Sequence, residues 1–334
     1  MIKSYCIALA FIISSFVGWS QENKEKIISN GKPIATLHAN VYSGINAGDN
    51  PTGFVIRRAY LGYQFNLPNN FHAQFVLDIG SPDDVSDELL KKRVAYFKYA
   101  MVYYQKEKIR LCFGMIPTTL FKVQEKIWGH RYIAKTVTDA QKMGSSADLG
   151  MAFHYAAFKA VSFDVAILNG EGYSSIQNDG SYRVAAGVTI KPFNGLTYRA
   201  YADYTQKNAS QITFLNFISY NWKNKVILSA EYAKQNNYQL VKDQDLTVWS
   251  VYASYNMSER WQLFGRFDQV ESNLSPSYLL PWHLAKDGSY TILGLQYTLQ
   301  ENVKLALDYK LWNPPNSLEQ SSEQFVYFNV MFKL

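Results

Sequence analysis

Apolar residues recur at every second position in many segments of the chain. The stretch FHAQFVLDI, residues 71–79, has apolar side chains at all odd-numbered positions and His, Gln and Asp at three of the even-numbered ones. The stretch VKLALDYKL, residues 303–311, repeats this order with Lys, Ala, Asp and Lys between the apolar positions. Because successive side chains of a strand point to opposite faces, a period of two predicts strands with one apolar face.

About sixteen segments follow this period, which predicts an all-β fold class. The predicted strands are 34–45, 53–66, 70–79, 93–105, 107–115, 148–157, 159–169, 181–191, 195–205, 211–222, 225–236, 245–256, 259–271, 289–299, 302–312 and 322–334. Segments 107–115 and 211–222 have the weakest pattern. A count of 14 strands therefore stays open as the alternative to 16.

The links between these segments alternate in length. The short ones are 67–69, 106, 158, 192–194, 223–224, 257–258 and 300–301. The longer ones are 46–52, 80–92, 116–147, 170–180, 206–210, 237–244, 272–288 and 313–321. With these boundaries every long link exceeds every short one. Short turns at one end and long loops at the other are typical of an up-and-down antiparallel transmembrane β-barrel.

The chain ends in a strand with one fully apolar face. In FVYFNVMFKL, residues 325–334, the apolar set is Val326, Phe328, Val330, Phe332 and Leu334. In lipid every backbone polar group has to be paired, so the sheet must close and the last strand must pair with the first. We therefore expect this face to contact outer-membrane lipid. A terminal strand of this kind is also what barrel-assembly machinery commonly reads.

The amino terminus has the pattern of a signal peptide. Lys3 precedes a mostly apolar run from Tyr5 to Val17, and the small residues Gly18 and Ser20 precede a cleavage site before Gln21. This order predicts a secretory signal peptide over 1–20 and a barrel domain over 21–334. The alternative is a membrane anchor, but the run is shorter than the roughly 20 residues that a helical span needs. Export to the outer membrane of a Gram-negative cell is the expected localisation.

Composition excludes several other classes of protein. Aromatic residues make up 16% of the chain, and the formal net charge is only +6. No run of Lys or Arg suggests nucleic-acid binding. Beyond the predicted signal peptide Cys112 is the only cysteine, so we expect neither a disulfide framework nor a cysteine metal site. No cofactor is expected.

Three stretches resemble the phosphate-selective porins O and P. They are FVIRRAYLGYQF followed by NLPNNFHAQFVLDIG (54–80), KYAMVYYQKEKIRLCFGMIPTTLF (98–121), and VAILNGEG with YRVAAGVTIKPFNGLTYRAYADY (165–172 and 182–204). The order of these motifs is more specific than any one of them, and the resemblance spans most of the chain. It implies a 16-stranded homotrimeric outer-membrane channel for anions, and it leaves the solute open.

Charged residues occupy the strand faces opposite the lipid face. The cations are Arg58, Lys98, Arg110, Arg183, Arg199, Arg266, Lys304 and Lys310, and the acids are Asp78, Asp164, Asp203, Glu231, Asp268 and Asp308. The planar guanidinium suits phosphate and carboxylate, and a ring of cations in a pore favours anions. We expect these cations to line the pore and bind anions. The alternative for each is a structural brace with a lumenal acid. Arg57 falls on the strand face opposite to that of Arg58, and the pattern does not predict where its side chain lies.

The longest link, 116–147, is expected to narrow the pore. In the general porin architecture the third loop folds into the barrel. Here it carries five cations against Glu125 and Asp139, with His130 in addition. These cations are Lys122, Lys126, Arg131, Lys135 and Lys142. We therefore expect a constriction loop with a positive bias. The alternative is a loop that lies in solvent outside the barrel.

These features predict a water-filled diffusion channel for small solutes with a weak preference for anions, phosphate among them. A general non-selective porin is one alternative. A sugar-preferring porin is another, since the inward phase carries some aromatic residues, namely Tyr60, Tyr96, Tyr201 and Phe264. A barrel enzyme needs a nucleophile with a positioned base. The five histidines are scattered over separate segments without such a motif, so we expect no catalytic site and no metal site.

Overall fold

The computed structural model describes residues 30–45, 50–80, 94–176, 180–276, 279–318 and 320–334. The predicted signal peptide over 1–20 lies outside the described residues and stays a prediction. The strands all belong to the unit Gly31–Leu334. Among the residues that the structure describes, no helix is both long enough and apolar enough to cross a membrane.

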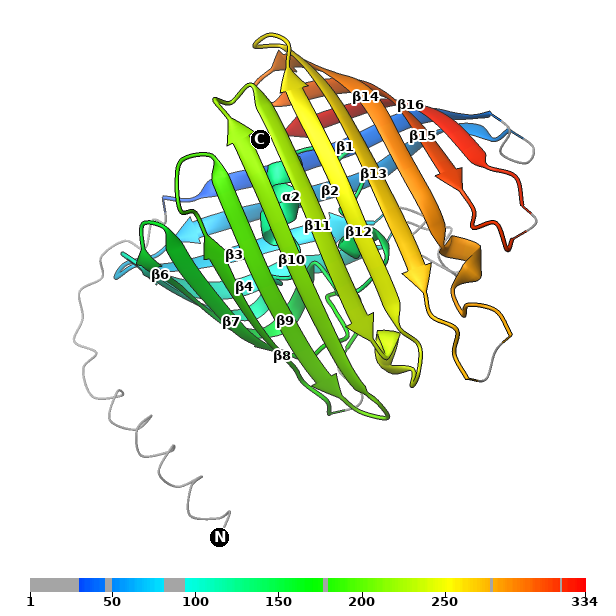
Figure 1. Ribbon diagram of the computed structural model, residues 1–334. Coiled ribbons are helices and arrows are strands. Elements are labelled where there is room, and N and C mark those ends of the chain that lie inside the picture. The colour runs from blue at the N-terminus through cyan, green and yellow to red at the C-terminus, as the bar shows by residue number, and fades with distance from the viewer. Residues whose placement is uncertain (1–29, 46–49, 81–93, 177–179, 277–278, 319) are drawn as a thin grey trace, which may run out of the picture. The chain divides into compact units, whose positions relative to one another are not determined.

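Sixteen strands form one closed barrel in which each strand pairs with its neighbours in the sequence, and β1 pairs with β16 (Figure 1). They are β1 (Lys32–Ile45), β2 (Thr52–Asn66), β3 (Phe71–Ile79), β4 (Ala95–Lys106), β5 (Ile109–Pro117), β6 (Ala147–Phe158), β7 (Val161–Leu168), β8 (Arg183–Ile190), β9 (Leu196–Gln206), β10 (Ser210–Trp222), β11 (Val226–Asn236), β12 (Leu246–Asn256), β13 (Trp261–Ser272), β14 (Gly288–Gln300), β15 (Val303–Asn313) and β16 (Glu323–Lys333). The predicted all-β antiparallel barrel of sixteen strands is confirmed.

The links also alternate in length, with one exception. The predicted long link 206–210 is a tight hairpin, because β9 extends to Gln206 and β10 begins at Ser210. The amide of Lys207 donates to the carbonyl oxygen of Ala209 at 3.2 Å within this hairpin. It is shorter than the link 191–195 at the opposite end. The expectation that every long link exceeds every short one was therefore wrong at this hairpin.

The barrel is apolar outside and polar inside. On β16 the outward Phe328 is 44% exposed, whereas Asn329 is 0% exposed and its amide contacts Asp308. The closing pair repeats this division, since Asn40 of β1 donates to Asn329 at 3.4 Å on the inner side. Outward apolar side chains such as Phe113 are exposed all round the wall. This arrangement is the reverse of a soluble protein and is typical of a barrel surrounded by lipid.

The chain between β5 and β6 forms α2 (Lys122–Trp128) and α3 (Val137–Ala140). We call this segment, 118–146, the inner loop, and Figure 1 shows α2 within the ring of strands. Helix α2 ends at Trp128 and is capped by Gly129, whose φ of 68° is the left-handed conformation that glycine adopts readily. Two short 3₁₀ helices, η3 (Tyr238–Leu240) and η4 (Leu284–Lys286), lie in the loops that follow β11 and β13.

The hydrophobic core lies between the inner loop and the inner side of the wall. The loop contributes Leu120, Phe121, Trp128, Tyr132, Ile133, Val137 and Met143. The wall contributes inward residues of strands from β4 to β15, and those of β10 to β14 include Leu215, Phe217, Leu246, Val248, Phe264 and Ile292. Apolar burial therefore helps to attach the loop to the inner wall.

Candidate functional site

Inward-facing side chains hold the inner loop against the wall. Residues of β9, β11, β13 and β15 donate to loop carbonyl oxygens, in the pairs Arg199–Thr119, Gln235–Met143, Arg266–Lys135 and Lys310–Ile133, at 2.6–2.7 Å. The inner loop thus lies inside the barrel. Three of the cations that the sequence predicts as anion ligands also fix this loop.

Buried aromatic side chains surround His130 in the inner loop. Its Nδ1 lies 2.6 Å from the carbonyl oxygen of Trp128, and its Nε2 lies 2.9 Å from the side-chain oxygen of Gln262. The His130 ring also lies 4.3 Å from that of Phe264 between centroids. Burial lowers the pKa of His130 to about 4. His130 is therefore neutral near pH 7, and the positive bias of the loop rests on its lysines and Arg131.

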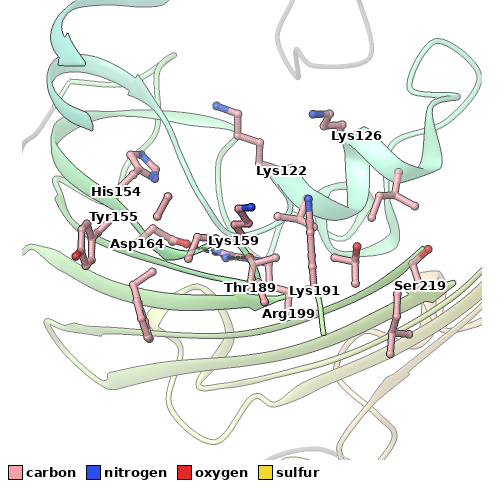
Figure 2. Close-up of a pocket in the computed structure, with 18 of the residues that line it drawn as sticks. Lys122, Lys126, His154, Tyr155, Lys159, Asp164, Thr189, Lys191, Arg199 and Ser219 are labelled. Carbon is pink, nitrogen blue, oxygen red and sulfur yellow. Dashed lines mark hydrogen bonds and ion pairs between the residues drawn. The ribbon is translucent and has the colours of Figure 1, made fainter. Parts of the chain in front are cut away.

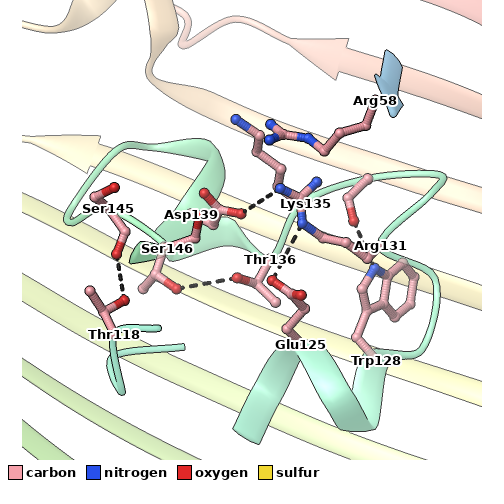
Figure 3. A network of polar contacts seen from close by, with 12 residues as sticks. Arg58, Thr118, Glu125, Trp128, Arg131, Lys135, Thr136, Asp139, Ser145 and Ser146 are labelled. Carbon is pink, nitrogen blue, oxygen red and sulfur yellow. Dashed lines mark hydrogen bonds and ion pairs between the residues drawn. The ribbon is translucent and has the colours of Figure 1, made fainter. Parts of the chain in front are cut away.

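Arg131 lies at the centre of a charged network in the inner loop. Its Nε is 3.3 Å from a Glu125 oxygen, and its Nη2 is 3.1 Å from an Asp139 oxygen. Figure 3 shows Arg58 of β2 and Lys135 of the loop extending toward the same region. The two acids of the loop therefore neutralise Arg131 in part, while further cations gather beside it.

A β-bulge brings both Arg57 and Arg58 to the inner side of β2. Arg58 pairs with His38 of β1, but the next pair joins Ile56 to Ala39, so Arg57 is the extra residue. A bulge inserts one residue and redirects its side chain. The Arg57 guanidinium accordingly lies 5.8 Å from the ring centroid of Tyr327 on β16. A strict period of two cannot predict this placement.

Two cavities flank the inner loop. One of about 490 Å³ lies toward the long loops, and we call it the long-loop cavity. Its charged lining residues are Arg57, Arg58, Arg131, Lys135, Lys142, Arg266 and Lys310, with Asp268 and Glu323 as the acids. Inward residues of β1, β2 and β13 to β16 form its wall.

The other cavity, of about 1110 Å³, lies toward the short turns and is called the short-turn cavity. Its charged lining residues are Lys108, Arg110, Lys122, Lys126, Lys159, Lys191 and Arg199, with Glu107 and Asp164 as the acids. Figure 2 shows Lys122 and Lys126 of α2, with Lys159 and Lys191 of two short turns, around this space. Burial, with the nearby Arg110, lowers the pKa of Lys122.

The structure divides the predicted site residues between these places. Arg58, Arg266, Lys310, Arg131 and Lys135 line the long-loop cavity, whereas Arg110, Arg199, Lys122 and Lys126 line the short-turn cavity. Lys98, Arg183 and Lys304 line neither of the two.

The first two of these remaining cations have other contacts. Lys98 contacts Ser146 and lies 4.1 Å from the ring centroid of Tyr173. Arg183 has an Asp203 oxygen at 4.0 Å and the Thr205 hydroxyl at 3.3 Å. Lys98 therefore contacts the loop between β5 and β6 and the loop after β7. Arg183 contacts other residues of the wall.

Several cations form ion pairs and also border a cavity. Arg199 makes two hydrogen bonds with Asp164, at 2.8 and 3.0 Å, and Arg266 reaches Asp268 at 2.7 Å. The carboxylates that pair with Arg58, Arg131 and Lys310 are Asp78, Glu125, Asp139 and Asp308. None of these four lines the long-loop cavity. Asp308 is buried while the Lys310 side chain keeps part of its surface exposed, whereas Arg58 and Asp78 are both buried. The Glu125 side chain is more exposed than that of Arg131, so the acid of this pair stays accessible.

Sequence reasoning missed a second segment that contacts the inner wall. Tyr173, in the loop after β7, donates to Asp78 at 2.8 Å and accepts from Arg58 at 3.1 Å. It also missed Lys108, Lys159 and Lys191 in or beside short turns. Their clustering at one end of the predicted barrel was a usable signal. Within the described ranges, no group of three or more His, Cys, Asp or Glu side chains could hold a metal ion.

No protein-family model and no curated protein matches the chain. Solved structures do. The outer-membrane channel DcaP of Acinetobacter baumannii has a TM-score of 0.69 at 10% identity, over 94% of this chain and 100% of that one. The anion-selective porin from Comamonas acidovorans has 0.63 at 12% identity, over 92% and 100%. OprB of Pseudomonas putida has 0.68 at 9% identity, over 91% and 94%. The chain therefore has the fold of the outer-membrane porins.

Proposed function

We propose that the protein is an outer-membrane porin, a water-filled diffusion channel that weakly prefers small anions such as phosphate. The observation that carries this proposal is the charge of the two cavities beside the inner loop. Each is lined by seven Lys or Arg side chains and by two acids. At Lys310 the paired acid Asp308 is buried while the lysine side chain keeps 24% of its surface exposed, so a solute meets the cation first there.

The charges that line the two cavities should affect ion selectivity more strongly than the modest net charge of the chain suggests. Low-dielectric walls focus the field of nearby charges onto an ion in a narrow passage. At physiological salt, charges farther than about 8 Å are largely screened. The lining cations should therefore outweigh the charges on the outer rim. The preference is expected to be weak because Arg131, Arg199 and Arg266 are each paired with an acid.

Further parts of the proposal follow from the sequence and from the fold. The predicted signal peptide over 1–20 would direct export, and the terminal strand would engage the assembly machinery. A homotrimer is proposed because the fold matches porins that include a trimer form of OmpT from Vibrio cholerae. The anion-selective porin from Comamonas acidovorans supports the direction of the ion preference.

The test is the reversal potential of the purified channel in planar bilayers under a KCl gradient. We expect its sign to indicate that chloride permeates more readily than potassium. A reversal potential with the opposite sign would overturn the anion preference. Failure to form any channel, with the protein shown to be folded by its heat-dependent gel mobility, would overturn the pore itself.

A further inference from the structure

The long-loop cavity has an aromatic wall as well as cations. Tyr290, Trp312, Phe325 and Tyr327 line it from the three consecutive strands β14, β15 and β16. The strand register places Tyr290 opposite Trp312, and their rings stack with centroids 6.2 Å apart. The rings of Phe325 and Tyr327 lie 6.0 Å apart. Four rings therefore form one face of the cavity.

Two of these rings are fixed by their polar ends. The indole nitrogen of Trp312 donates to the carbonyl oxygen of Asp287 at 3.1 Å, and the Tyr290 hydroxyl donates to that of Lys286 at 2.9 Å. Their ring bodies are only partly buried. Rigid rings that keep exposed surface lose little freedom when a ligand stacks on them, which favours binding.

Cations lie beside this aromatic wall. Lys310 Nζ is 4.0 Å from the ring centroid of Tyr327, and the Arg57 guanidinium is 5.8 Å from it. Arg131 and Lys135 border the cavity from the inner loop. The cavity thus joins a flat apolar face to a positive one.

A cavity with both aromatic rings and cations favours solutes that can contact both over solutes that can contact only one. The face of an aromatic ring is electronegative, so a bare phosphate or chloride gains nothing from it. A neutral sugar can lie on the rings but gains little from the cations. A solute that carries both a carboxylate and an aromatic ring uses both faces at once. The volume of about 490 Å³ is in the range of small-molecule sites.

We propose that the long-loop cavity binds aromatic carboxylates, with the carboxylate at the Arg57, Lys135 and Lys310 cations and the ring on Tyr290 and Trp312. This inference rests on the proposed channel function, and it names the class of solute that the channel takes up.

The experiment measures block of the chloride current in planar bilayers by added organic acids. Benzoate is compared with cyclohexanecarboxylate, which has the same charge and a saturated ring, and with inorganic phosphate and glucose. Aromatic pairs contribute about 0.5–1.5 kcal/mol beyond area burial. We therefore expect benzoate to block at concentrations about two- to tenfold lower than cyclohexanecarboxylate. Equal block by the two acids, or equal block by phosphate or glucose, would overturn the proposal.

Variants then locate the site. Trp312→Leu should abolish the difference between the two acids, and Trp312→Phe should retain it. Trp249→Leu is the matched control, because Trp249 lies on the outer face of β12 and packs against the outward Phe267. If Trp312→Leu keeps the discrimination, the aromatic wall is not the site. If it does not fold, the comparison of the two acids on the unaltered channel still decides.

The same bilayers separate this inference from the proposed function. The reversal potential of the unaltered channel reports ion preference without any organic acid. A cation-preferring channel would overturn the proposed function. An anion-preferring channel that treats the two ring types alike would overturn the aromatic site alone.

Discussion

Several lumenal arginines are buried by the structural contacts that they make. Arg199 is the most buried example, with 1% of its surface exposed, and it bonds both oxygens of Asp164 and the carbonyl oxygen of Thr119. Its Nη atoms therefore join β7, β9 and the inner loop. At 1% exposure Arg199 fits the alternative of a structural brace, because Asp164, Thr189 and Thr119 occupy both of its Nη atoms.

Replacing Arg199 by Met should destabilise the barrel strongly. Breaking a buried ion pair on one side costs about 3–5 kcal/mol, because the other charge is left without its partner. The double variant Arg199→Met with Asp164→Asn should recover part of this loss. Urea unfolding of the protein in lipid vesicles measures both, with Lys304→Met of β15 as the control. A double variant no more stable than the single one would contradict the pairing.

Selectivity is expected to respond to the lysines of α2. Lys122→Gln with Lys126→Gln removes two cations of the short-turn cavity and touches none of the ion pairs described above. The reversal potential under a KCl gradient should move toward zero, with a modest change in conductance. Lys304→Gln, which lines neither cavity, should do less. A larger effect of Lys304 would place the selective region elsewhere.

At the scale of elements, the inner loop is attached by a buried group that can titrate. His130 has a pKa of about 4 in the docked loop, against 6.5 when exposed to solvent. Between these values the undocked loop binds more protons, so docking is strongest above about pH 6.5 and weakens as the pH falls toward 4. Acid is therefore expected to loosen the constriction.

We expect larger and noisier conductance at pH 4 than at pH 7. Glu125 and Asp139 also face this region through Arg131, so the pH effect needs a variant that isolates the imidazole. His130→Gln keeps a polar side chain that does not titrate and should reduce the difference between the two pH values. An unchanged pH response in this variant would assign the effect to the carboxylates.

The terminal strand β16 should tolerate charge on one face only. Phe332 pairs with Leu37 on the outer side of the closing seam. Phe332→Asp with Leu334→Asp places charges on the lipid face, at a cost from about zero to a few kcal/mol depending on depth. We expect less heat-modifiable barrel in the outer membrane. Lys333→Asp, on the inner face of the same strand, is the control. Equal amounts of folded barrel in all three proteins would refute the expectation.

The period of two predicted every strand, with each boundary within two residues of the observed one. It was weakest where the inner loop covers the wall. On β10 the inward Leu215 and Phe217 pack against that loop, and on β5 the inward Cys112 and Ile116 are buried. Both faces of such strands are apolar, so the alternation fades. Contacts across the lumen, such as Tyr173 with Asp78, join residues far apart in the sequence and leave no periodic signal.

For the whole molecule, the arrangement of charge matters more than its sum. A formal net charge of +6 describes 334 residues, whereas each cavity gathers seven cations and two acids on its lining. The fold concentrates these cations because the inward phase of the strands carries them, and because the inner loop adds its own lysines. Net charge alone would not have distinguished this barrel from a neutral one.

The two cavities have no lining residue in common, since one is built on β1, β2 and β13 to β16 and the other mainly on β4 to β10. Substitutions in one arc can accumulate without altering the chemistry of the other. Under the proposed channel function, selection for a new solute in the long-loop cavity can therefore proceed while the short-turn cavity stays unchanged. The inner loop contributes residues to both cavities. A substitution in this loop can therefore alter either cavity and has to preserve the chemistry of both.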